Sequence, residues 1–108
     1  MTLEQFEKVF EARIDLCRRV LIGKNQEYAR GGDKLSNFKK AAGMLGQTPE
    51  GALLGMMAKH QVSIADLIQD LDKGTHHSMA MWEEKIGDAL NYLLLLRGLL
   101  AERYGNQK

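Results

Sequence analysis

The sequence predicts a small all-α protein, a compact four-helix fold with three long helices and one short helix. Apolar residues recur at intervals of three and four along most of the chain, and no segment alternates apolar and polar residues as a strand would. Capping and helix-breaking residues divide the chain at three places. A length of 108 residues suits one domain with one hydrophobic core, so we expect residues 1–108 to form a single all-α domain.

The first two helices are predicted over residues 2 to 28 and from Asp33 to about Leu45. Thr2 and Gln5 have the spacing of a capping box, in which each side chain bonds the other residue's backbone N–H. The stretch "YARGGDKLSNF" contains a Gly pair that breaks the first helix, and Asp33 after it offers an N-cap for the second. The apolar stripe of the first helix consists of Phe6, Phe10, Ile14, Cys17 and Leu21.

The third and fourth helices are predicted from Thr48 to about Asp72 and from Ser78 to about Tyr104. Thr48 is a suitable N-cap because Pro49 follows at the first helical position, where a missing N–H costs nothing. The stretch "KGTHHS" ends the third helix, and its serine can cap the fourth. Its two histidines have no Cys or Glu at metal-ligand spacing, so we expect them to be exposed in the turn.

Composition excludes several classes of function. With 44% hydrophobic residues, 27% charged residues and a net charge of +1, the chain lacks the bulk charge for binding duplex nucleic acid. One cysteine excludes an internal disulfide, and "MTLEQFEKVFEAR" resembles no signal peptide, so we expect a cytoplasmic protein. The longest apolar stretch, "ALNYLLLLRGLLA", is interrupted by Asn91 and Arg97 and is shorter than the roughly 20 residues of a membrane span. We expect it to be a core helix and no membrane to be a partner.

Both long C-terminal helices carry apolar residues on more than one side. A single small bundle would leave part of that surface exposed, so we expect a homo-oligomer with one of these helices at its seam. In the third helix the apolar residues are Leu53, Leu54, Met56, Met57, Val62, Ile64, Leu67, Ile68 and Leu71.

Polar stripes on the third and fourth helices suggest a cluster. Their members are spaced by three and four, so each stripe lies on one helix face, and two antiparallel neighbours could bring the stripes together. Carboxylates and an amide in such a cluster could hold Mg²⁺ against substrate phosphates. Alternatively, the outer acids are solvated and Asp88 pairs with Lys59 or Lys85. The stripes consist of Lys59, Ser63, Asp66 and Asp70, and of Glu84, Asp88 and Asn91.

The stretch "KNQEYARGGDKLSNFKK" has the parts of a nucleotide pocket. Lys and Arg neutralise phosphates, an aromatic ring stacks on a base, and backbone N–H groups at a Gly-rich helix start suit an anion. A solvated loop between two helices would have the same composition, and "GGDKLS" lacks the glycine spacing of a P-loop. The candidate nucleotide-binding residues are Lys24, Tyr28, Arg30, Lys34 and Asn37, with Lys59 and His60 as further phosphate donors.

The stretch "EKIGDALNYLLLL" resembles the last metal-binding helix of the all-α, MazG-like nucleoside triphosphate pyrophosphohydrolases, which commonly reads Glu-Glu-x-Gly-Asp before apolar residues. Together with "KNQEYARGGDKLSNFKKAA" and "TPEGALLGMMAKH", it makes nearly the whole chain similar to a group of small bacteriophage proteins. The resemblance implies Mg²⁺ ligands at i and i+3 on this helix and a Glu-x-x-Glu pair on the preceding one. Here Lys85 stands three residues before Asp88, where a ligand is expected, and "MMAKHQVSIADLIQD" has no such acidic pair.

Three hypotheses follow for the function. The first is a phage-type protein that binds a nucleotide without efficient catalysis, for instance to sequester a host signalling nucleotide in the host cytoplasm, and that requires no cofactor. The second is a Mg²⁺-dependent nucleotide pyrophosphohydrolase. The third is a structural or partner-binding helical oligomer without a small ligand. In the second hypothesis the metal ligands are Glu84 and Asp88, helped by Asp66 or Asp70.

Overall fold

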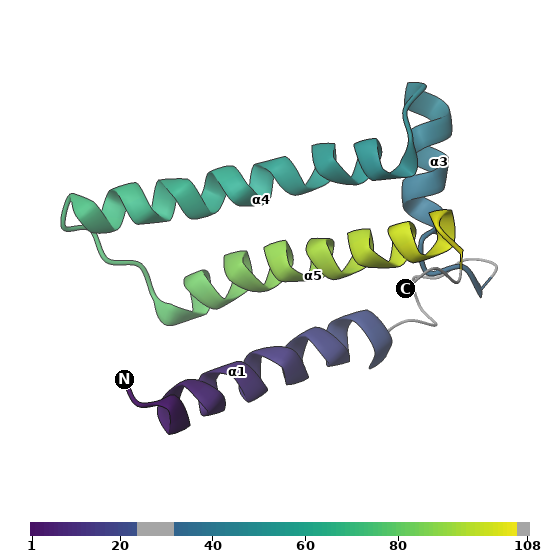
Figure 1. The fold of residues 1–108 in the computed structure, drawn as a ribbon. Helices are drawn as coiled ribbons and strands as arrows, with labels where there is room; N and C mark the ends of the chain where they lie inside the picture. The colour runs from purple at the N-terminus through teal and green to yellow at the C-terminus, as the bar shows by residue number, and fades with distance from the viewer. Residues whose placement is uncertain (24–31, 106–108) are drawn as a thin grey trace. The chain divides into compact units, whose positions relative to one another are not determined.

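The computed structural model describes residues 1–23 and 32–105, which form helices joined by turns (Figure 1). No strand occurs in the described part of the chain, so the predicted all-α, four-helix class is confirmed. None of the helices in these ranges combines the length and apolar character needed to cross a membrane. The chain forms two compact units, Met1–Lys34 and Leu35–Lys108, which are described separately.

The N-terminal unit consists of helix α1 (Leu3–Arg18) and a π-helical turn, η1 (Arg19–Gly23), that continues it. The predicted capping box is confirmed, because the Gln5 N–H donates to Thr2 Oγ1 at 3.1 Å and the Thr2 N–H donates to Gln5 Oε1 at 2.8 Å. The first helix was predicted to reach residue 28. It is helical through residue 23, and residues 24–28 lie outside the described residues.

Helix α3 (Ser36–Leu45) begins later than the sequence predicts, and the predicted N-cap is wrong. The N-cap is Leu35, which offers no side-chain cap, and not Asp33. Leu35 and Phe38 are both buried in the core of the C-terminal unit, so tertiary packing determines where the helix begins. Gly46 ends the helix in the left-handed conformation, with φ of 65°, and its N–H donates to the Ala42 carbonyl.

The two long helices begin where their caps predict. In α4 (Pro49–Asp72) the hydroxyl of Thr48 accepts the Gly51 N–H at 3.0 Å. In α5 (Met79–Arg103) the hydroxyl of Ser78 accepts the Met81 N–H at 3.1 Å. These bonds satisfy backbone N–H donors of the first turn that have no partner within the helix. Both predicted helix starts are confirmed.

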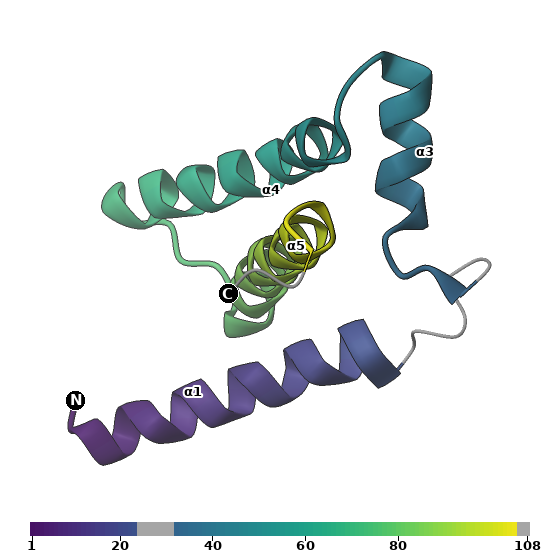
Figure 2. The same ribbon diagram turned by 45° about the vertical axis from the view of Figure 1, so that its right-hand side comes forward.

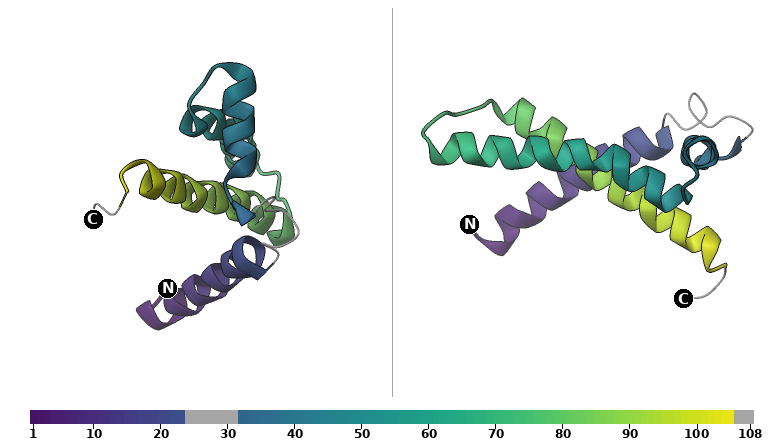
Figure 3. Two further views of the ribbon diagram at one scale, coloured as in Figure 1. Left: turned by 90° about the vertical axis from the view of Figure 1, so that its right-hand side faces the viewer. Right: turned by 90° about the horizontal axis from the view of Figure 1, so that it is seen from above.

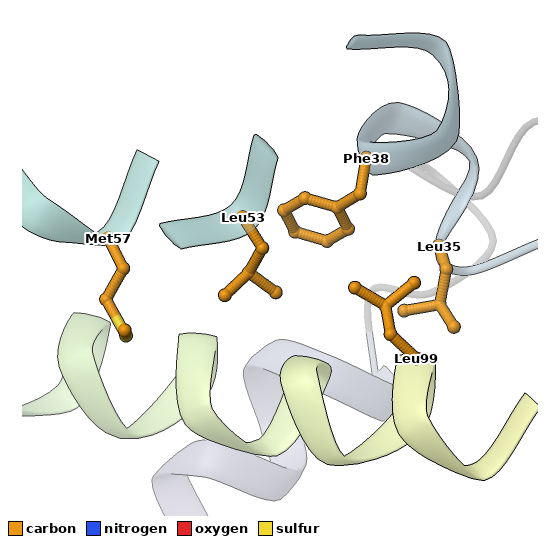
Figure 4. Close-up of a cluster of buried hydrophobic side chains, with 5 residues drawn as sticks. All are labelled: Leu35, Phe38, Leu53, Met57 and Leu99. Atoms are coloured by element: carbon orange, nitrogen blue, oxygen red, sulfur yellow. The ribbon is translucent and has the colours of Figure 1, made fainter. Parts of the chain in front are cut away.

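In the C-terminal unit α4 and α5 run antiparallel, and α3 stands across the end where α4 begins and α5 ends (Figures 1 and 2). Seen from above, α4 and α5 cross at an angle (Figure 3). The core lies at this end of the unit, where Phe38 points toward Leu53 and Leu99 (Figure 4). The buried cluster consists of Leu35, Phe38, Leu53, Met57 and Leu99.

Candidate functional site

A half-buried cluster lies in the seam between α4 and α5. His60 of α4 faces α5, and its Nδ1 lies 3.5 Å from Oδ2 of Asp88. The His60 ring also contacts the ring of Tyr92, with centroids 5.1 Å apart and planes tilted by 34°. Tyr92 also meets Phe38 of the core in an edge-on contact, with ring centroids 6.3 Å apart. The seam cluster of His60, Asp88 and Tyr92 therefore begins where the apolar core ends.

Helical spacing explains how this cluster forms. Met57, His60 and Leu67 are spaced by three and seven residues, so they share the side of α4 that packs on α5. Asp88 and Tyr92 are four residues apart and share one face of α5. The His60 side chain is 17% exposed and the Asp88 side chain 40% exposed, so the carboxylate side of the cluster is open to solvent.

The polar stripe of α4 does not face α5. Lys59 and Asp66 are exposed, and the Ser63 hydroxyl donates to the Lys59 carbonyl of its own helix at 2.9 Å. Asp70 accepts a bond of 2.8 Å from Nε2 of His77, which lies in the turn before α5. The apolar side of α4 occupies the seam because burying it is worth about 25 cal/mol per Å². Asp88 is consequently paired with His60, and not with Lys59.

His77 differs from its predicted role. The two turn histidines were expected to be exposed, but His77 is half-buried and bonded to Asp70, and only His76 is exposed. The bond links the last turn of α4 to the residue before the Ser78 cap of α5. It therefore fixes the path of the turn.

The described residues contain no group of three or more His, Cys, Asp or Glu side chains that could hold a metal ion. Of the four carboxylates predicted as metal ligands, Glu84 and Asp66 are exposed. The other two, Asp70 and Asp88, each pair with a different histidine. Within the described ranges these four acids are thus not assembled into a metal-binding group.

The predicted nucleotide-binding residues are only partly described. Lys24, Tyr28 and Arg30 lie outside the described residues. Lys34 is half-buried in the turn before α3, and Asn37 is exposed in the first turn of that helix. Lys59 and His60 are adjacent on α4, about 100° apart around the helix, so only His60 enters the seam.

Asn91, which belongs to the polar stripe of α5, has a side-chain oxygen that is unsatisfied within the described ranges. Its Oδ1 is buried and has no hydrogen-bond partner among the described residues. An unpaired buried acceptor costs about 1–3 kcal/mol. Asn91 lies three residues after Asp88 on α5. An N–H donor that reached its Oδ1 would recover this free energy.

A second set of charges lines a hollow of about 280 Å³ at the end of the unit where α3, α4 and α5 meet. Arg103 donates from Nε and from a terminal nitrogen to the two Glu50 oxygens, both at 2.7 Å, and Lys39 lies 2.8 Å from Glu102. The guanidinium bonds lower the pKa of Glu50 to about 2, and the carboxylate raises the pKa of Arg103. These two cations and two anions have no net charge, so the set offers no charge to attract a ligand. The Glu50–Arg103 pair joins the start of α4 to the end of α5.

Sequence reasoning missed both these ion pairs and the role of Tyr92. The ion pairs join residues more than fifty positions apart, and no local pattern predicts such a pairing. Tyr92 had a usable signal, because it lies one helical turn after Asp88 on the same face.

Models of protein families, curated proteins and solved structures all give no match to this chain. The resemblance to the MazG-like enzymes therefore stays a prediction based on the sequence motifs. The chemistry of the chain's own side chains carries the functional argument.

Proposed function

We propose that this protein binds a phosphorylated nucleotide and does not hydrolyse it efficiently. The supporting observation is the seam cluster. In it His60 of α4 and Asp88 of α5, both candidate site residues in the sequence analysis, meet beside the ring of Tyr92. A binding site for a nucleotide needs an aromatic surface, a hydrogen-bonding group for the base edge and a cation for phosphate. The cluster and its neighbour Lys59 supply one group of each kind.

Each group has a distinct role in this proposal. The rings of His60 and Tyr92 provide stacking surface, which is worth about 1–3 kcal/mol per base. The half-exposed carboxylate of Asp88 accepts a hydrogen bond from an amino group of the base. Lys59, exposed at the position before His60, attracts phosphate as a flexible point charge.

Binding without metal is favoured over metal-dependent hydrolysis by the partners of the acids. Asp88 and Asp70, two of the four predicted Mg²⁺ ligands, are each occupied by a histidine. A cation at Lys85 stands where the enzyme pattern has a carboxylate. Pyrophosphate hydrolysis with Mg²⁺ remains the alternative that the family resemblance implies.

The test is binding in EDTA. Purified protein is heated with mono-, di-, tri- and cyclic nucleotides of each base, and a ligand at ten times its Kd adds about 1.4 kcal/mol of stability. For a chain of this size that corresponds to a rise of about 6–11 °C in Tm. Equilibrium dialysis with the same nucleotides then gives the affinity.

Two matched pairs of variants locate the site. His60→Ala should weaken binding, whereas His76→Ala, which removes an exposed turn histidine, should leave it unchanged. Lys59→Glu should weaken binding about 10- to 100-fold, since a charged hydrogen bond is worth about 1.5–3 kcal/mol. Lys73→Glu makes the same charge change at an exposed residue after α4 and should have little effect.

The outcomes separate the alternatives. If no nucleotide raises Tm or is retained in dialysis, the binding proposal is wrong. Release of pyrophosphate with Mg²⁺ or Mn²⁺, abolished by Asp88→Ala, would establish hydrolysis instead. Self-association is a separate proposal, which shares Lys59 with this one.

A further inference from the structure

Between Leu54 and Gln69, one side of α4 is exposed and carries no charge. Its eight residues are spaced to form a continuous strip about 140° wide and about 22 Å long, from the rise and rotation of an α-helix. The side chains of Leu54 and Val62 are 57% and 59% exposed, and Ile68 is 47% exposed. We call this strip the neutral face; it consists of Leu54, Gly55, Ala58, Gln61, Val62, Ala65, Ile68 and Gln69.

Such a strip is unusual for a solvated helix. The exposed side of a helix ordinarily carries charged residues, and 27% of this chain is charged. The small residues Gly55, Ala58 and Ala65 would also let the backbone of another helix approach closely. The space beside Gly55 is open, since nothing lies within 4 Å of a Cβ built there. The neutral face therefore has the composition of a helix-packing surface.

The charges beside the neutral face indicate what packs on it. Lys59 and Asp66, both exposed, flank the same edge of the face, 3.5 residues before and after a point between Val62 and Ser63. A two-fold axis through that point, perpendicular to both helices, places Lys59 of one copy at the height of Asp66 of the other, on the same side. A parallel pair would put these edges on opposite sides. The pattern is complementary to itself only in the antiparallel arrangement.

We propose that the neutral face of α4 binds the neutral face of a second copy of this chain, with the two helices antiparallel. Two Lys59–Asp66 pairs flank the contact, and Val62 of each copy lies at its centre. The contact is isologous, so one surface serves both copies and the assembly closes as a dimer.

The size of the face sets the expected affinity. A stable interface buries about 800 Å² per partner, and a single helix strip about 22 Å long and 10 Å wide provides less. We therefore expect a dimer that dissociates at concentrations on the order of 10–100 µM.

The first experiment is sedimentation equilibrium of the full chain from about 1 to about 500 µM, a range that spans the expected dissociation constant. The apparent mass should rise from 12.1 kDa toward twice that value. Val62→Glu should keep the protein monomeric, because it places two like charges at the two-fold axis. Its matched control, Gln47→Glu, makes an acidic change at an exposed residue before α4 and should leave dimerisation unchanged.

Charge reversal tests the antiparallel register. Lys59→Asp turns two attractive pairs into two repulsive ones and should raise the dissociation constant by at least about tenfold at low salt. The double variant Lys59→Asp with Asp66→Lys exchanges the charges and should restore dimerisation. Only an arrangement that brings residue 59 of one copy to residue 66 of the other predicts this rescue. The double variant lacks Lys59, so loss of nucleotide binding in it is independent of dimerisation.

Several results would overturn the proposal. A mass that stays at 12.1 kDa through the whole range refutes it. A dimer that Val62→Glu does not affect uses another surface, and a double variant that stays monomeric excludes the antiparallel register. If the chain is monomeric and Val62→Glu lowers its unfolding midpoint, the neutral face is covered by another part of the same chain. Circular dichroism of each variant shows whether its helices remain intact.

Discussion

Replacing Leu53 by alanine is expected to lower the free energy of unfolding by about 2.5–4 kcal/mol. Leu53 is completely buried and belongs to the core cluster that joins α3, α4 and α5. The change removes three carbon atoms, which at about 0.8 kcal/mol each accounts for about 2.4 kcal/mol. The cavity that remains adds to this, and substitutions of this kind cost about 2.7–5 kcal/mol in other cores.

The neighbouring residue provides a matched control. Leu54→Ala makes the same chemical change in the same helical turn, but Leu54 is 57% exposed and lies on the neutral face. Its loss should cost less than about 1 kcal/mol, because little of its surface is buried and alanine favours the helix. Urea unfolding followed by far-UV circular dichroism measures both variants, at a few micromolar so that dimerisation does not contribute.

The comparison can refute the fold argument directly. A domain is stable by only about 5–15 kcal/mol, so the expected loss at Leu53 moves the unfolding midpoint far beyond experimental error. If Leu53→Ala costs no more than Leu54→Ala, the two residues have similar environments. Leu53 would then not be the centre of a packed core, and the placement of α3 across α4 and α5 would be wrong.

Two further predictions concern backbone conformation and acid stability. In α3, Gly46→Ala should destabilise by about 1–2 kcal/mol because Gly46 has φ of 65°, whereas Gly43→Ala in the open helix interior should stabilise by about 0.5–1 kcal/mol; urea unfolding checks both, and equal effects would contradict the assigned helix end. Folding lowers the pKa of Glu50 to about 2 through Arg103, so its contribution to stability is complete above the unfolded pKa of about 4.5 and is lost as pH falls toward 2. The variant Glu50→Gln should therefore lose less stability than the wild type between pH 4.5 and 2, and identical pH profiles would argue against the Glu50–Arg103 pair.

Local chemistry made much of the fold predictable. The capping residues Thr2, Thr48 and Ser78 each satisfy backbone donors within three residues, so the signal and its effect are adjacent in sequence. The N-cap at Asp33 was predicted by the same rule and failed. Burial of Leu35 against distant residues decided that helix start, and a local rule contains no information about distant residues.

The candidate site was predictable to the same limited depth. Helical spacing alone puts Lys59 with Asp66 on one face of α4, and Asp88 with Asn91 on one face of α5. It did not determine which face of α4 would turn toward α5, because that depends on the apolar area buried by each choice. Consequently the partner of Asp88 is His60, the residue beside the predicted Lys59.

The core cluster also determines when the chain can fold during its synthesis. Leu35 and Phe38 are made early, but Leu99, which belongs to the same cluster, follows more than sixty residues later. At about 5–20 residues per second, the ribosome needs roughly 3–13 s for that interval. Until then the apolar residues of α3 and α4 lack Leu99, their partner from α5, and this core cannot close.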